Sequence, residues 1–117
     1  MANEITIQVS LQVVKGLLSV ARAVQHQVTM TGTVMQHGVQ AIGTSKENLV
    51  LGDVSSPGYV LLRNLDAANY VEFGADADTP FGKMKAGETA LFRLAAAPIS
   101  VKANTAAADV EYWVLAD

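Results

Sequence analysis

Apolar and polar residues alternate strictly along the first part of the chain. From position 5 to position 13 every odd position is aliphatic, and every even position carries a hydroxyl or an amide. A period of two is the repeat of a β-strand, whose successive side chains point to opposite faces. The alternation returns over residues 24–32. The pattern therefore predicts two long strands.

Between these strands, Gly16 interrupts the pattern. It lies between two pairs of adjacent apolar residues, at 13–14 and 17–18. A glycine inside a strand pattern indicates a bulge or a bend, and we interpret Gly16 as a point where the chain changes sheet. A helix over residues 17–24 is the alternative that the sequence leaves open.

The rest of the chain contains short apolar stretches separated by turns rich in Gly, Pro, Asn and Asp. The stretches lie at 34–35 with 39–42, 49–51, 59–65, 70–74, 89–94, 99–104 and 110–116. A spacing of about 8 to 12 residues is typical of a sandwich or jelly roll. We predict an all-β fold, an antiparallel, jelly-roll-like β-sandwich of about eight to ten short strands. Residues 1–117 are predicted to be a single domain, in which residues 1–42 form either part of the sandwich or an interface arm.

All seven aromatic residues lie between positions 59 and 113, so the second half is expected to supply the main core. Tyr112 and Trp113 are neighbours on one predicted strand. One ring should therefore point into the core and the other outward.

Charge limits the classes of partner. The chain has 8 basic and 11 acidic side chains, a formal net charge of −3, and no cluster of Lys or Arg. Phosphate backbones are held by clustered positive charge, so no nucleic-acid partner is expected. No apolar run approaches the roughly 20 residues of a membrane span, and residues 1–4 lack the basic region of a secretory signal. We expect no membrane partner.

The uncharged polar faces of the first strands are the candidate functional surface. An exposed strand usually carries Lys or Glu, which prevent pairing with a neighbouring molecule. These faces carry only amides and hydroxyls, at Thr6, Gln8, Ser10, Gln12, Gln25, Gln27, Thr29 and Thr31. Removing water from such side chains at an interface costs less free energy than removing water from ions. We predict that residues 4 to about 42 lie at a subunit interface, with an ordinary exposed sheet surface as the alternative.

A search for chemistry finds no site. The chain has no cysteine, which excludes a disulfide, a thiolate metal site and a cysteine nucleophile. His26 and His37 are eleven residues apart, a spacing that matches no metal-ligand motif. Asp76 and Asp78 offer carboxylates to a hard cation, but we interpret them as turn residues. We expect no catalytic residue, no metal, no cofactor and no enzymatic activity.

Five blocks of the second half carry a resemblance to a known family. The blocks are 59–66 (YVLLRNLD), 69–74 (NYVEFG), 80–81 (PF), 85–88 (KAGE) and 91–94 (LFRL). Over residues 57–116 the chain resembles small structural proteins of tailed bacteriophages. The resemblance implies a β-sandwich component of the virion without enzymatic activity, such as a capsid decoration or cement protein, or a part of the neck or tail. It brings no ligand or catalytic residue.

We therefore expect a bacteriophage structural protein, located in the virion, that stabilises the capsid shell as a decoration protein. Its expected partners are copies of itself, in a trimer, and a major capsid or tail protein. The alternatives are a neck or tail component, and a virion-borne module that binds a receptor or carbohydrate. Such a module would use loops 55–58 and 75–82, where Tyr59 and Phe81 supply rings.

Overall fold

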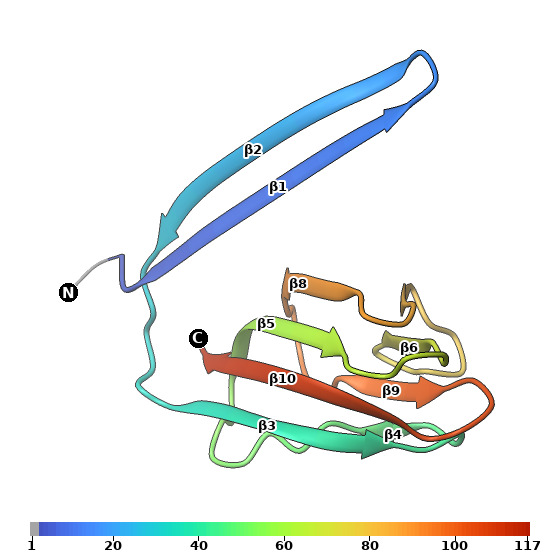
Figure 1. Ribbon diagram of the computed structural model, residues 1–117. Coiled ribbons are helices and arrows are strands. Elements are labelled where there is room, and N and C mark those ends of the chain that lie inside the picture. Colours follow the sequence, from blue (N-terminus) through green and yellow to red (C-terminus); the bar gives the residue numbers. More distant parts are fainter. Residues whose placement is uncertain (1–2) are drawn as a thin grey trace. The chain divides into compact units, whose positions relative to one another are not determined.

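The computed structural model describes residues 3–117, which divide into two compact units (Figure 1). One unit ends at Thr31 and the other is Gly32–Asp117. Every strand pairing is antiparallel, and residues 3–117 contain ten strands and no helix. The prediction of an all-β antiparallel fold is confirmed. In the described part of the chain there is accordingly no helix long and apolar enough to span a membrane.

The first unit is a long β-hairpin, which we call the hairpin arm. Strands β1 (Ile5–Lys15) and β2 (Leu18–Val28) pair along their full length, from Ile5 opposite Val28 to Lys15 opposite Leu18. Gly16, with a φ of +57°, is the first of two turn residues. Glycine with positive φ at this position is the mark of a type II′ turn, whose twist matches that of the paired strands. Within residues 3–117 these two strands pair only with each other.

The hairpin arm corrects the interpretation of Gly16. The chain does not change sheet there but reverses direction, and residues 17–24 do not form the alternative helix. The second strand begins at Leu18 and ends at Val28, so it starts earlier and stops earlier than the predicted range 24–32. The physical reason is that Gly at the first position of a two-residue loop is sufficient to close a hairpin.

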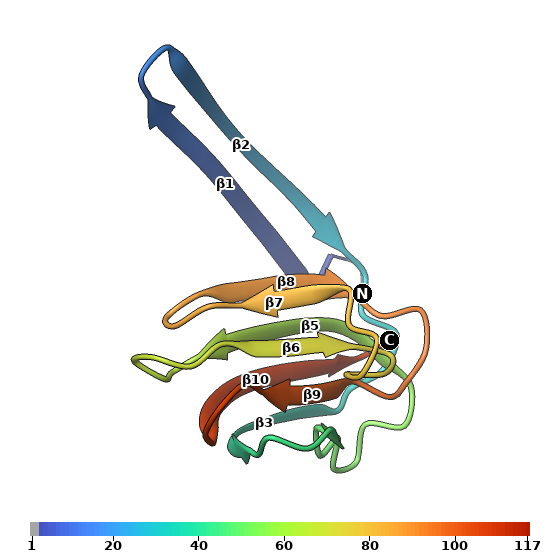
Figure 2. The same ribbon diagram turned by 90° about the vertical axis from the view of Figure 1, so that its right-hand side faces the viewer.

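The second unit is a sandwich of two four-stranded sheets, which Figure 2 shows as two layers. The strand orders are β3-β10-β5-β8 and β4-β9-β6-β7. The first sheet consists of β3 (Met35–Ile42), β10 (Ala108–Ala116), β5 (Pro57–Asn64) and β8 (Thr89–Arg93). The second consists of β4 (Glu47–Asn48), β9 (Ser100–Ala103), β6 (Val71–Gly74) and β7 (Gly82–Met84).

The pairing of these eight strands is that of a jelly roll. The pairs β3–β10, β4–β9, β5–β8 and β6–β7 are nested in the sequence and alternate between the two sheets. The chain is thus one long antiparallel double strand wound into a sandwich. Strand β7 falls in a segment that was expected to be loop and turn, and β3 runs through Gly38 without interruption.

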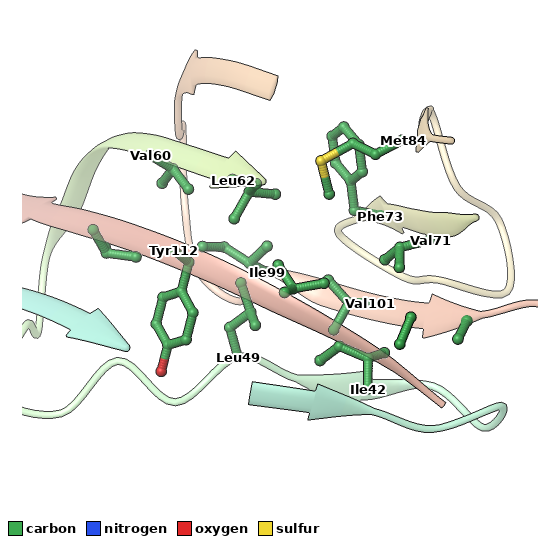
Figure 3. Close-up of a cluster of buried hydrophobic side chains, with 14 of the residues drawn as sticks. Ile42, Leu49, Val60, Leu62, Val71, Phe73, Met84, Ile99, Val101 and Tyr112 are labelled. Carbon is green, nitrogen blue, oxygen red and sulfur yellow. The ribbon is translucent and has the colours of Figure 1, made fainter. Parts of the chain in front are cut away.

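Aliphatic side chains fill the space between the sheets (Figure 3). The buried cluster consists of Ile42, Leu49, Val54, Val60, Leu62, Val71, Phe73, Met84, Ile99, Val101, Ala103, Ala108, Val110, Tyr112 and Val114. All of these residues belong to the second unit, so the sandwich has a complete core of its own. Rings contribute less than expected, because Phe73 and Tyr112 are buried whereas Phe81 is exposed. Tyr112 points inward and Trp113 outward, as the alternation predicted.

Asn64 is fully buried at the end of β5 and joins two turns. Its Nδ2 donates to the carbonyl oxygens of Asn69 at 2.9 Å and Met84 at 3.1 Å. Its Oδ1 accepts from the backbone N–H of Asp66 at 3.0 Å. Buried polar groups are tolerated when their hydrogen bonds are made. Asn64 therefore fixes where β5 ends and where the following hairpin begins.

Candidate assembly interface

The register of the hairpin arm sorts its side chains into two faces, because residues opposite each other in an antiparallel pair share a face. One face, which we call the apolar face, carries nine aliphatic residues together with Lys15, Arg22 and His26. Its aliphatic residues are Ile5, Ile7, Val9, Leu11 and Val13 from β1 and Leu18, Val20, Val24 and Val28 from β2. The other face contains the polar residues predicted to form an interface. The two-residue turn thus sets a register in which the apolar positions of β1 lie mostly opposite those of β2, and the polar positions opposite the polar and alanine positions.

The polar face brings together part of the predicted set. Thr6 lies opposite Gln27, and Gln8 lies opposite Gln25. The Gln8 Nε2 donates to the Gln25 Oε1 at 3.3 Å, which makes a cross-strand amide pair in the middle of the arm. Ser10 and Gln12 face alanines instead, at positions 23 and 21. All six polar side chains are exposed.

Thr29 and Thr31, the other two predicted interface residues, lie beyond the end of β2. Both are exposed, and the Thr29 hydroxyl accepts a hydrogen bond from the backbone N–H of Asn3 at 3.4 Å, at the base of the arm. The predicted interface segment ran to about residue 42, but residues 32–42 belong to the sandwich unit and include β3. The structure thus places the segment in two units, and its contact role stays a prediction.

The apolar face is the feature that sequence reasoning missed. Leu11 is 60% exposed, Val9 51% and Val24 45%, whereas Ile7 is buried. The sequence interpretation named only the polar faces of these strands as a candidate surface. The signal that could have shown the apolar face to be exposed as well is the Gly16-Leu17 pair, which folds the two patterns onto each other before any third strand can join. A contiguous exposed apolar surface of this kind marks an interaction site or an aggregation hazard.

Charge is divided unequally between the two units. The arm contains Glu4, Lys15 and Arg22 and has a net charge of +1, which leaves −4 for residues 32–117. Lys15 and Arg22 lie on the apolar face, opposite Leu18 and Leu11 respectively. Their long stems can lie along apolar surface while their charged ends remain in water. The apolar face of the arm therefore carries positive charges among its aliphatic side chains.

The acidic loop of the sandwich is held by lysines. The Lys46 Nζ lies 3.1 Å from Asp76 Oδ1 and 3.3 Å from Asp78 Oδ2, and the Lys102 Nζ lies 3.2 Å from Asp78 Oδ1. The backbone N–H of Asp78 is the main cause that lowers the pKa of Asp76. Hydrogen bonds from Lys102 and then Lys46 lower the pKa of Asp78. These carboxylates serve a turn and an ion-pair network. Among the described residues, no group of three or more His, Asp or Glu is placed to hold a metal ion.

The two histidines lie in different units, His26 on β2 and His37 on β3. His37 stacks on Trp113, with ring centroids 4.6 Å apart and planes 9° apart. Its Nε2 lies 3.5 Å from the Glu111 carboxylate. His37 thus forms a stacked ring pair with Trp113 on the outer face of the sheet that contains β3 and β10.

Comparison with known proteins identifies no relative of this chain. No protein-family model, curated protein or solved structure matches the chain. The function must therefore be inferred from the arm and the sandwich themselves.

Proposed function

We propose that this protein is a structural protein that works by assembly: copies of it adhere to one another and to a larger protein lattice. The observation that carries the proposal is the exposed apolar face of the hairpin arm. Following the resemblance to structural proteins of tailed bacteriophages, the lattice is a virion, and the role is capsid decoration or cement. A neck or tail position is the alternative within the same class.

The physical basis is the cost of leaving the arm uncovered. Apolar surface gains about 25 cal/mol for each Å² removed from water. A two-stranded ribbon also presents an unpaired backbone edge along each strand, and such edges template pairing with other chains. An isolated hairpin is marginally stable in water, so a second surface packed on it would stabilise the arm itself. Coverage by neighbouring molecules would bury the apolar face, pair the open strand edges and stabilise the hairpin.

The polar face supplies a second contact surface of different chemistry. The six exposed polar side chains at Thr6, Gln8, Ser10, Gln12, Gln25 and Gln27 can exchange water for hydrogen bonds to a partner. None of them is charged, so the desolvation cost is low. In this proposal the polar face contacts the partner lattice, a major capsid or tail protein.

Light scattering of the purified full chain tests the proposal. We expect a mass that is a multiple of 12.3 kDa, with a trimer as the specific prediction. The double variant Gln8→Lys with Gln12→Glu adds one charge of each sign to the polar face. It should weaken assembly with the lattice more than it lowers the melting temperature of the subunit. A chain that stays monomeric at high concentration and binds no virion surface would overturn the proposal.

A second candidate function rests on Phe81, which is 74% exposed. Its ring lies at a hollow of about 390 Å³ that Phe73, Phe92 and Pro98 also line. An exposed ring beside an apolar hollow fits a receptor-binding role, and the mostly apolar lining suits a protein side chain better than a sugar. Binding of host-cell envelopes by the parent chain, and its loss in Phe81→Ala, would favour this function. Equal binding by both proteins would exclude it.

A further inference from the structure

The sandwich carries a second exposed apolar surface, on the outside of the sheet β3-β10-β5-β8. Register places His37, Trp113, Leu61 and Leu91 side by side in one row across the four strands. Met35 and Leu115 form a shorter row beside it. These six residues point away from the core, because their neighbours along each strand point inward. We call them the outer patch.

The outer patch is unusual for a sheet face that meets water. Solvated faces of antiparallel sheets normally carry polar side chains. Here Met35 is 54% exposed, and Leu61 and Leu91 are each 37% exposed. The rings of His37 and Trp113 stack on each other at the β3 end of the row. An apolar sheet face of this kind suits packing against another sheet face.

We propose that the outer patch binds the apolar face of the hairpin arm from a second copy of this chain. The inference deepens the proposed function, on which it rests, by naming which surfaces meet in self-assembly. Each subunit gives one arm and receives one. A closed ring of such contacts is compatible with the expected trimer.

Area favours this partner over direct contact between two arms. Strands of eleven residues are about 36 Å long and a two-stranded ribbon is about 10 Å wide, so one face covers about 360 Å². Two arms packed together would cover only that area on each subunit and would leave the outer patch in water. An exchange of arms covers the apolar face and the outer patch of every subunit, so more apolar surface leaves water per subunit than in arm-to-arm contact.

Charge favours the same arrangement. The arm has a net charge of +1 and the sandwich one of −4, so an arm and a sandwich attract, whereas two arms repel. Lys15 and Arg22 lie on the face of the arm that would be covered. Asp109 and Glu111 lie on the outer side of β10. Glu111 lies 3.5 Å from His37 and opposite Arg63, so the exposed Asp109 is the acidic side chain that the arm's basic ones can approach.

Trp113 is a built-in reporter, because it is the only tryptophan of the chain and lies in the outer patch. On assembly its emission should shift to shorter wavelength, and quenching by acrylamide should fall several-fold relative to the dilute subunit. Leu11→Thr keeps a β-forming residue but removes apolar area from the arm. In this variant the emission shift and the loss of quenching should require at least about tenfold higher protein concentration. Gln12→Thr, on the opposite face of the same strand, is the matched control and should show both changes at the same concentration as the parent chain.

Cysteine trapping identifies the occupant, and the chain contains no cysteine that would interfere. Leu11→Cys and Leu61→Cys both lie at exposed positions, so neither substitution threatens folding. A mixture of the two full-length variants should form a disulfide between an arm and a sandwich of different copies, while each variant alone should not. Val24→Cys mixed with Leu91→Cys provides a second pair for the same contact.

Each outcome decides between the two proposals. Arm-to-sandwich disulfides between copies, together with shielding of Trp113, support the inference. Several results overturn it while leaving the proposed function intact: an oligomer in which Trp113 stays as accessible as in dilute solution, disulfides that join arm to arm, or shielding without an arm-to-sandwich disulfide. A disulfide within one copy of the double variant Leu11→Cys with Leu61→Cys, formed in preference to links between copies, also overturns it. A monomer at every concentration that binds no virion surface overturns both.

Discussion

The hairpin arm and the sandwich are built from the same alternating pattern, yet they treat their apolar residues differently. In the sandwich each sheet covers the inner face of the other, and Val60, Leu62 and Val110 are completely buried. In the arm Val9 and Leu11 remain largely exposed. The comparison teaches that a period of two specifies a strand and its faces but does not specify what covers them. In the arm we assign that role to a neighbouring molecule.

The largest expected effect comes from Leu62→Ala in the sandwich. Leu62 is fully buried between the sheets (Figure 3), so the substitution removes buried methyl groups and leaves a cavity. We expect the free energy of unfolding to fall by about 3 to 5 kcal/mol. Urea denaturation followed by far-ultraviolet circular dichroism measures this change in dilute protein.

The matched substitution in the arm is Leu11→Ala, which removes the same atoms from an exposed position. In dilute protein it should change the unfolding free energy by no more than about 0.5 kcal/mol. In concentrated protein it should weaken self-association about tenfold. Equal losses of stability at Leu62 and Leu11 in dilute protein would show that the arm is part of the folding core, and the comparison would break.

An effect somewhat smaller than that of Leu62→Ala is expected from Asn64→Ala, which tests the buried hydrogen bonds of the sandwich. The variant leaves the carbonyl oxygens of Asn69 and Met84 without the donor they now share. Unsatisfied buried polar groups cost about 1 to 3 kcal/mol, so we expect a loss of about 2 to 3 kcal/mol in unfolding free energy. Asn48→Ala, at an exposed asparagine, is the control and should change stability by less than about 0.5 kcal/mol. Equal losses of unfolding free energy in the two variants would show that the buried hydrogen bonds of Asn64 do not stabilise the sandwich.

Much of the fold could be predicted because it depends on local signals. Alternation placed most of the strands, and turns rich in Gly were expected between them; Gly87, with a φ of +79°, lies in one of these turns. The sandwich class was predicted from the number and spacing of the strands, whereas their pairing was not. Strand β7 was missed because it spans only Gly82–Met84, too short for a period of two to be visible.

The candidate site was predicted only in part, since its chemistry depends on contacts that no local pattern specifies. The polar residues of the first strands were identified, and register brings Gln8 next to Gln25. The apolar face was overlooked because alternation alone does not distinguish a covered face from an exposed one. The outer patch could not be predicted from the sequence for a different reason. His37, Leu61 and Trp113 are far apart in the sequence and meet only through strand pairing.

The smallest expected effect concerns acid, to which the two regions should respond differently. The sandwich holds ten of the eleven carboxylate side chains, and the arm only Glu4. In the sandwich the pKa of Asp78 is lowered by hydrogen bonds from Lys102 and Lys46. A lowered pKa in the folded state adds stability above the unfolded value of 3.8, and this stability is lost as the pH falls through the lowered pKa.

Lys102→Gln should therefore raise the pKa of Asp78 and lower the melting temperature at pH 6, by a few degrees at most, because the pair is exposed and screened by solvent. The difference from the parent chain should shrink with added salt and disappear in strong acid, where Asp78 is protonated in both proteins. Arg22→Gln in the arm is the control, since the structure records no ion pair for Arg22 among residues 3–117. Scanning calorimetry of dilute protein between pH 6 and pH 2.5 makes the measurement. If Arg22→Gln reproduces the pH-dependent loss seen with Lys102→Gln, the arm carries an electrostatic role in the stability of the subunit, and the division between a self-sufficient sandwich and an arm that serves assembly does not hold.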